Sequence, residues 1–353
     1  MIVEPDFLSD TLINWYAENH RDLPWRHHPS PYQVWISEII LQQTRVNQGR
    51  EYYLRFIERW PTVESLAQAS EEEVLKTWQG LGYYSRARNL LQCARQVVGQ
   101  HGGAFPADFN LLLKLKGIGN YTAAAIASIA FGLPHAVVDG NVFRVLSRLF
   151  DIDTPININE GQAAFAQLAD ELLDRDRPGL HNQAMMEFGA LHCTPKNPDC
   201  LLCPLQAQCM ALARRTVMQR PVKTAKAKVT TLYLNYLVLR FDDKTYLRKR
   251  SGNGIWRNLY DFPCVESPKP MEVEAVLKSE QFLQLIGNNT FTVTKVTPDF
   301  THKLTHRTLV ARFIEIKLSQ ELPPFETKDI FLTREKDLGR YPIPRLIDLY
   351  LNT

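Results

Sequence analysis

The chain has 353 residues, of which 45% are hydrophobic, and a formal net charge of +3. This length exceeds what one ordinary compact core requires, so we expect about two domains. No stretch approaches the roughly 20 apolar residues that a membrane-spanning helix needs, and a small net charge means that affinity for a polyanion would depend on local basic patches.

Helical spacing dominates the first 110 residues. Apolar side chains recur at helical intervals over residues 7–16, and prolines between residues 24 and 31 then indicate a loop. A strongly apolar helix follows from Tyr32, and Glu38 lies inside it among apolar neighbours. The pattern fits a solvent-facing glutamate as well as a buried one. In a buried position, desolvation would raise the pKa of Glu38 and hold a proton for delivery, as a general acid requires.

Residues 78–89 combine two glycines with paired tyrosines and two arginines. Aromatic rings beside arginine can stack on bases and bind backbone phosphates. The same residues could instead form a packed aromatic corner with a solvated arginine face. The pattern alone does not separate these two interpretations.

The turn Gly117-Ile118-Gly119 lies between two apolar helical segments, residues 111–115 and the Ala-rich residues 123–130. Glycine lets the backbone turn sharply, and the free amides that start the following helix suit a phosphate. This arrangement is typical of a helix-hairpin-helix DNA clamp, although a plain helix–helix turn has the same glycines.

Asp139 is a single acid in an apolar run, directly before another helical segment. A buried, unpaired carboxylate is costly, which favours a function, but aspartate is also a common helix N-cap. Further along, Gln183 and Glu187 lie four residues apart on one helical face. They form either a surface pair or a group that contacts a base, because a carboxylate can accept a hydrogen bond from an exocyclic amine.

Four of the six cysteines are clustered as Cys193-x6-Cys200-x2-Cys203-x5-Cys209. Four thiolates in one short loop can complete the ligand set of one metal centre, whereas a structural zinc site usually shows two CxxC-like pairs. Cys93 and Cys264 have no such neighbours in sequence and are expected to be ordinary buried thiols.

The sequence pattern changes after the cysteines. Residues 214–228 contain six basic residues and no acid, which predicts an interdomain linker that lies along a polyanion. From residue 229 a strand-like period appears: strands are predicted at 231–239, 245–250, 291–297 and 308–318, and helices at 271–285 and 344–351.

Together these motifs resemble the helix-hairpin-helix DNA glycosylase superfamily, in which a Gly/Pro-rich loop and an aspartate follow the hairpin. The segment SEIILQQT and the cysteine spacing narrow the resemblance to adenine DNA glycosylases of the MutY type. The resemblance implies a mainly α glycosylase domain over residues 1–213, with a 4Fe–4S loop at 193–209. It further implies a basic linker over 214–228 and an α+β Nudix-like domain over 229–353.

Residue roles follow from the resemblance, position by position. The expected catalytic residues are Glu38, Asp139, Tyr121 and Asn141. The expected adenine-binding residues are Trp25, Arg26, Leu41, Gln183 and Glu187. The expected DNA-binding residues are Gln43, Thr44, Tyr83, Gly117 and Gly119. The expected cluster ligands are Cys193, Cys200, Cys203 and Cys209.

The segment Gly252–Pro263 resembles the part of Nudix domains that precedes their catalytic helix, but the Glu-rich Nudix box is missing. The C-terminal domain is therefore expected to recognise a lesion rather than to hydrolyse nucleotides. Leu304, Thr305 and His306 match the family's Phe-Ser-His loop, with leucine in place of the aromatic residue.

The function that the resemblance implies is base excision repair. We expect a monomeric, cytoplasmic protein that associates with the bacterial nucleoid through duplex DNA and hydrolytically removes adenine paired with 8-oxoguanine or guanine. Tyr121 stands where bifunctional relatives carry a Schiff-base lysine, so a monofunctional glycosylase is expected. Two alternatives remain at this point: an endonuclease III-like enzyme for oxidised pyrimidines, and a non-catalytic sensor of DNA damage.

Overall fold

The computed structural model describes residues 3–27, 29–224, 229–304, 306–325 and 329–353. Two compact units are present: the first comprises residues 1–69 and 89–225, and the second comprises residues 70–88 and 226–353. The second unit thus includes a segment from the helical part of the sequence. The predicted domain boundaries at residues 213 and 228 stay predictions.

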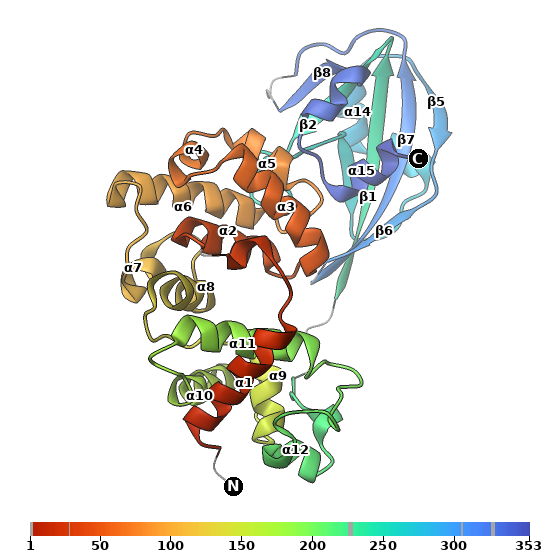
Figure 1. Cartoon of the computed structure of the whole chain (residues 1–353). Coiled ribbons are helices and arrows are strands. Elements are labelled where there is room, and N and C mark those ends of the chain that lie inside the picture. Colours follow the sequence, from red (N-terminus) through yellow and green to blue (C-terminus); the bar gives the residue numbers. More distant parts are fainter. Residues whose placement is uncertain (1–2, 28, 225–228, 305, 326–328) are drawn as a thin grey trace. The chain divides into compact units, whose positions relative to one another are not determined.

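The first unit is helical, as predicted (Figure 1). Its helices are α1 (Pro5–Asn19), α2 (Pro31–Leu41), α3 (Val46–Arg59), α4 (Val63–Ala67), α7 (Phe109–Lys114), α8 (Asn120–Ala125), α9 (Gly140–Leu149), α10 (Asn159–Glu171), α11 (Pro178–Leu191) and α12 (Met210–Ala213), with the short helical turns η1 (Pro24–Arg26), η2 (Ile126–Ala130), η3 (Gln206–Gln208) and η4 (Val217–Gln219). Helix α6 (Ser85–His101) contributes residues to both units. No helix in the described ranges combines the length and apolar character needed to cross a membrane.

One core of the first unit lies between α1, α9, α10 and α11 and includes Leu12, Leu146, Phe165 and Phe188. Helix α2 is buried on nearly every side and packs against α3, α8 and η2. Its start is well specified, because Pro31 occupies the first turn and Ser30 forms a reciprocal capping box with Gln33. This burial takes Glu38 into the interior of the protein and decides the alternative that the sequence pattern left open.

The second unit contains α5 (Glu71–Trp78) and an eight-stranded mixed sheet. Its strands are β1 (Thr230–Phe241), β2 (Lys244–Lys249), β3 (Tyr260–Asp261), β4 (Cys264–Ser267), β5 (Phe291–Val296), β6 (Phe300–Lys303), β7 (Arg307–Leu318) and β8 (Ile330–Arg334); its remaining helical elements are α13 (Val273–Leu277), α14 (Glu280–Ile286), η5 (Glu335–Arg340) and α15 (Arg345–Leu351). The central strands β1 and β7 run parallel, and the other pairs are antiparallel. The four predicted strands are confirmed, whereas the helix predicted over 271–285 is two short helices.

Helices cover both faces of this sheet. Side chains alternate between faces along a strand, so Leu237 and Ile314 face the α13–α14 side, where they pack with Phe282. On the other face, Phe313 stacks on Tyr350 of α15 with ring centroids 4.1 Å apart. The sheet is therefore the middle layer of an α+β unit, as predicted.

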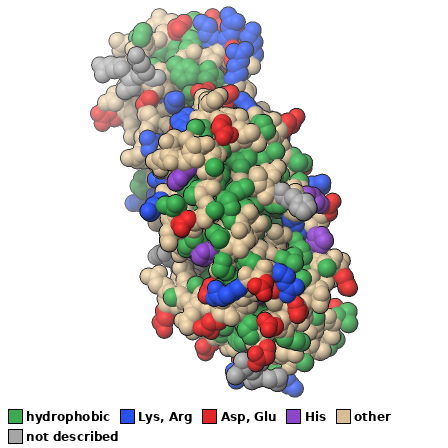
Figure 2. All heavy atoms as spheres, turned by 60° about the vertical axis from the view of Figure 1, so that its left-hand side comes forward, with side chains coloured by type: hydrophobic (Ala, Val, Ile, Leu, Met, Phe, Trp, Pro, Cys, Tyr) green, Lys and Arg blue, Asp and Glu red, His purple; other side chains and the backbone are tan. Residues whose placement is uncertain are grey.

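Segment 70–88 is tied to the C-terminal part of the second unit by polar contacts. Lys76 Nζ donates to the carbonyl of Tyr341 at 3.0 Å, and Arg88 donates to the carbonyl of Arg257 at 2.9 Å. Asn258 donates to the carboxylate of Glu71 at 2.6 Å. Figure 2 shows a group of Lys and Arg side chains at the top of the view, and mixed basic and acidic side chains near its bottom.

Candidate active site

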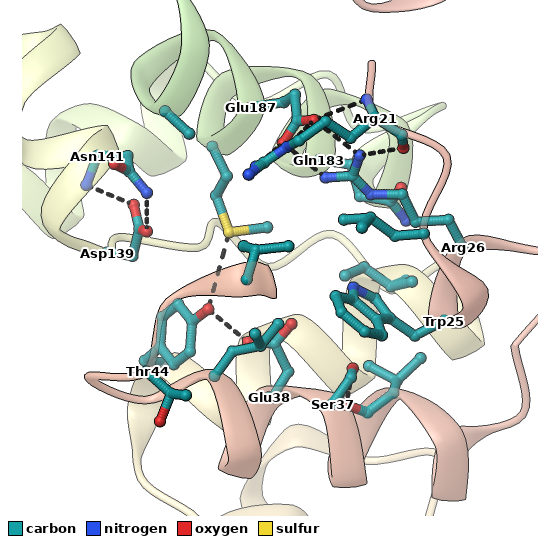
Figure 3. Close-up of a pocket in the computed structure, with 18 residues that line it drawn as sticks. Arg21, Trp25, Arg26, Ser37, Glu38, Thr44, Asp139, Asn141, Gln183 and Glu187 are labelled. Carbon is teal, nitrogen blue, oxygen red and sulfur yellow. Dashed lines mark hydrogen bonds and ion pairs between the residues drawn. The ribbon is translucent and has the colours of Figure 1, made fainter. Parts of the chain in front are cut away.

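A cavity of about 230 Å³ opens inside the first unit, between α2, α8, α9, α11 and the loop around η1 (Figure 3). Ten residues singled out from the sequence line it: Trp25, Arg26, Glu38, Leu41, Thr44, Tyr121, Asp139, Asn141, Gln183 and Glu187. The fold therefore brings together groups that lie up to about 160 positions apart in the chain. The lining residues that sequence reasoning missed include Arg21, Ser37 and Met186.

Glu38 is 7% exposed, and Oε2 of its carboxyl group accepts a short hydrogen bond from the hydroxyl of Tyr121. Burial raises the pKa of Glu38 to about 7, which outweighs the lowering effect of the hydrogen bond from Tyr121. The hydroxyl of Tyr121 also lies 3.8 Å from Sδ of Met186. Near neutral pH, Glu38 can therefore hold a proton and release it within the cavity.

Asp139 is the N-cap of α9. Its Oδ1 accepts from the backbone amides of Asn141 and Val142, both at 2.8 Å, and its Oδ2 accepts from the side-chain amide of Asn141 at 2.7 Å. Burial raises the pKa of Asp139, and these hydrogen bonds oppose that rise. The capping and cavity-lining interpretations are thus compatible, because one carboxylate does both.

Arg144, which is buried on α9, connects this site to the cysteine loop. Its Nη2 donates to Oδ1 of Asn141 at 2.9 Å and to the carbonyl of Gly189 at 2.6 Å, and its Nε donates to the carbonyl of Cys193 at 2.8 Å. Through Asn141, the orientation of Asp139 depends on a guanidinium group that is held by the start of the loop.

Glu187 lies at another wall of the cavity and is 1% exposed, so the surface-pair interpretation is wrong. Its two oxygens accept from Arg21 and Arg26, including a 2.8 Å contact with Nη2 of Arg26. Burial alone would raise the pKa of Glu187, but these donors hold the pKa at about 2. The only sequence signal for Arg21 is its place just before the LPWR segment.

The four clustered cysteines surround a small cavity of about 30 Å³, together with Arg148 and His192. Buried Arg148 lies 3.4 Å from Sγ of Cys193 and donates to the carbonyl of Thr194 at 2.7 Å. Within the described ranges, no group of three or more His, Cys, Asp or Glu side chains is arranged to hold a metal ion.

Comparison with known proteins places this geometry in a family. Residues 36–168 match the HhH-GPD superfamily of base excision DNA repair proteins, and residues 235–353 match the NUDIX domain. The adenine DNA glycosylase of Buchnera aphidicola subsp. Schizaphis graminum is 34% identical over 312 residues, which cover 88% of each chain. The chain belongs to the adenine DNA glycosylase family. The resemblance seen in the sequence is thereby confirmed.

Two further matches show how much of the chain is similar to known proteins. It is 37% identical to the adenine DNA glycosylase of Arabidopsis thaliana over 92% of its own length, but it spans 59% of that relative. A solved thermostable thymine-DNA glycosylase is 30% identical and superposes with a TM-score of 0.55, over 60% of this chain and 97% of that one. The helical glycosylase fold and a DNA-binding role in base excision repair follow from these matches.

The DNA-binding positions expected in this adenine DNA glycosylase family member lie outside the cavity, except for Thr44. Gln43 is exposed just after α2 and has a positive φ of 57°. In the hairpin, Gly117 has a φ of +78° and Gly119 is the N-cap of α8. Tyr83 also has a positive φ, 46°, and belongs to the second unit.

The second unit has a cavity of its own, of about 580 Å³. Tyr83, Arg88, Trp256, Leu304 and His306 are among the residues that line it. The structure thus brings Tyr83, an expected DNA-binding residue, to the same cavity as two residues of the expected lesion-recognition loop. Thr305, the third residue of that loop, lies outside the described residues.

Proposed function

We propose that the protein removes adenine paired with 8-oxoguanine or guanine from duplex DNA by hydrolysis. The observation that carries this proposal is one cavity that holds a buried carboxyl group with a pKa of about 7 and a second carboxylate of different environment. Two carboxyl groups with separate environments are the means by which glycosidases divide acid and stabilising roles. The adenine must leave the base stack to reach such a cavity, so base flipping is part of the proposal.

In the proposed reaction, Glu38 donates its proton to N7 of adenine. The bond between the sugar C1′ and the base nitrogen then breaks, and its electron pair leaves with the neutral base. The ionised Asp139 stabilises the positive charge that develops on the sugar, and Asn141 holds Asp139 in place. Water adds to C1′ and loses a proton, which leaves an abasic site.

The remaining cavity residues suit a planar base. Trp25 and Leu41 provide apolar surface, and Arg26 and Gln183 provide hydrogen-bonding groups. Glu187 accepts from two arginines at once, so its first effect on a base is to orient Arg26; a contact between Glu187 and the adenine amine uses acceptor capacity that remains on its oxygens.

The cavity in the second unit is the proposed site for the base opposite adenine. Tyr83 is 48% exposed and can fill space in an opened duplex, together with Gln43. Leu304 and His306 are proposed to contact 8-oxoguanine, with the leucine replacing aromatic stacking by apolar contact. The hairpin amides near Gly117 and Gly119 are proposed to bind the DNA backbone.

The four-cysteine loop is proposed to hold a 4Fe–4S cluster through Cys193, Cys200, Cys203 and Cys209. Four cysteines that line one small cavity can supply the four thiolate ligands of such a cluster, and their unequal spacing differs from the two CxxC-like pairs of a structural zinc site. Nε2 of His192, which borders the same cavity, is buried without a hydrogen-bond partner among the residues that the structure describes. When bound, the cluster would stabilise the loop against DNA; iron and sulfide analysis of the purified protein tests its presence.

Single-turnover release of adenine from duplexes with adenine opposite 8-oxoguanine, guanine or thymine tests the proposed function. We expect fast release opposite 8-oxoguanine, slower release opposite guanine and none opposite thymine. Because a phenol cannot form a Schiff base, strand breaks should appear only after alkali, and borohydride should trap no strong adduct. Release of oxidised pyrimidines instead of adenine, or no release from any duplex, would point to the pyrimidine enzyme or to a sensor.

A further inference from the structure

Tyr16 lies near the end of α1. It contacts two residues of the 230 Å³ cavity in the first unit, which we call the adenine cavity, but does not line that cavity itself. Its hydroxyl donates to Oε1 of Gln183 at 2.8 Å, across 167 positions of sequence. Its ring lies beneath the guanidinium group of Arg26, with Cζ 5.4 Å from the ring centroid. The ring itself is 7% exposed and stacks on His20, with centroids 4.8 Å apart.

Tyr16 belongs instead to a second cavity of about 690 Å³, which shares Arg21, Arg26 and Gln183 with the first. The side chains of Arg26 and Gln183 therefore form part of a wall between two hollow spaces. In this wall, Arg26 is held by the carboxylate of Glu187, and the Gln183 amide is held by the hydroxyl of Tyr16.

In the structure, the carbonyl end of the Gln183 amide is held by the hydrogen bond from the hydroxyl of Tyr16. A primary amide presents either a carbonyl acceptor or an amino group with two donors. Because the carbonyl oxygen accepts from Tyr16, the amino group is the end left for a ligand. The ring nitrogen N1 of adenine carries no hydrogen and can accept from these donors, whereas N1 of hypoxanthine and of guanine carries a hydrogen.

We propose that Tyr16 is a positioning residue that selects adenine by fixing the amide of Gln183 with its donors toward the base. The inference rests on the proposed adenine glycosylase function and adds to it a determinant of base specificity. Burial raises the pKa of Tyr16, so its hydroxyl stays protonated and remains a donor throughout the neutral range.

The variant Tyr16→Phe removes the hydroxyl and keeps the ring under Arg26, so it isolates the hydrogen bond. Tyr32→Phe is the matched control, because the hydroxyl of Tyr32 is also buried and donates to the carbonyl of Trp60 at 2.7 Å, away from the cavity residues. Single-turnover release is measured on duplexes that hold adenine or hypoxanthine opposite 8-oxoguanine, over a range of enzyme concentrations.

We expect Tyr16→Phe to raise the ratio of hypoxanthine to adenine release by about 3- to 10-fold, the effect of one net hydrogen bond. For the duplex that holds adenine, the enzyme concentration that gives half of the maximal single-turnover rate should rise by a larger factor than that maximal rate falls. Tyr32→Phe should leave the ratio unchanged. In a Gln183→Ala background, Tyr16→Phe should change the ratio by less than about 2-fold, because its target is gone.

Two results would overturn this role while the proposed function stands: equal ratios for Tyr16→Phe and Tyr32→Phe, or a full effect of Tyr16→Phe without Gln183. If the wild-type protein releases adenine from no duplex, the proposed function itself fails. The wild-type measurement on adenine therefore separates the two failures.

Discussion

The hydroxyl of Tyr121 donates a hydrogen bond to the carboxyl group of Glu38. Burial raises the pKa of that carboxyl group to about 7. Within this pair, burial favours the protonated carboxyl group and the phenol favours the ionised one. The working range of the proposed acid is set by the balance of these two effects.

The rate should therefore fall as the pH rises through about 7, because the acid form of Glu38 is lost. Tyr121→Phe removes the donor that favours the ionised form, so the pKa of Glu38 should rise and the alkaline limb should move to higher pH. Single-turnover rates between about pH 5 and 9 measure this limb. An unchanged limb in Tyr121→Phe would show that the hydrogen bond does not tune the acid.

Stability should depend on pH through the same group. The pKa of Glu38 is about 7 in the folded protein against 4.5 ordinarily, so the folded state holds a proton that the unfolded chain releases. The free energy of unfolding should accordingly fall as pH rises from about 4.5 to about 7, by on the order of 3 kcal/mol.

Glu38→Gln removes this titration, and urea unfolding at the acid and alkaline ends of that window measures the difference. The variant should lose activity by about 100-fold or more yet gain stability relative to wild type at the alkaline end. A parallel pH dependence in both proteins would contradict the assignment of the raised pKa to Glu38.

Asp139→Asn tests the charge of the second carboxylate apart from its capping role. Asparagine is also a good N-cap, so α9 should stay folded while release of adenine falls by about 100- to 1,000-fold. Asp108→Asn is the matched control, because Asp108 caps α7 by accepting from the amide of Leu111 at 2.8 Å and does not line the cavity. Equal activity of the two variants would exclude a role for the charge of Asp139.

Glu187→Gln leaves Arg26, whose side chain is 14% exposed, without its ionised partner. We expect a loss of on the order of 3 kcal/mol in the free energy of unfolding, together with weaker adenine discrimination. Asp10→Asn breaks an ion pair with Arg177 in which both side chains are exposed, so it should change the free energy of unfolding far less than Glu187→Gln does. Similar losses in urea unfolding for both variants would mean that the Glu187 pair is not energetically distinct from a surface pair.

Alanine substitutions at the two hairpin glycines should have different effects on stability. Gly117 has a positive φ, and a Cβ there would lie 2.8 Å from Cβ of Asn89, so Gly117→Ala should destabilise the fold by about 1–2 kcal/mol or more. Gly119 has an extended backbone and open space at the Cβ position, so Gly119→Ala should fold normally. Thermal unfolding compares them, and weaker binding of duplex DNA by Gly119→Ala would support an approach of the backbone to phosphate at that position.

Local sequence pattern was sufficient for much of the fold. Periods of 3.6 and 2 residues separate the helical part from the strands of the C-terminal part, because each period reflects which face of a single element is buried. The unpredicted strands β3, β4, β6 and β8 have two to five residues, too few for a period to show. The membership of segment 70–88 in the second unit was equally invisible, since its partners, such as Tyr341 and Arg257, lie far along the chain.

The residue types of the site can be read from the sequence: a glutamate within an apolar helix, an aspartate at a helix start and four cysteines at unequal spacing. These are properties of short segments, which local pattern can carry. The packing of the helices adds what no short segment shows: Glu38 is buried with its pKa raised to about 7, Glu187 is held by Arg21 and Arg26, and Tyr16 donates to Gln183. Such properties arise from desolvation and from contacts between distant positions, and both exist only once the helices have packed around one cavity.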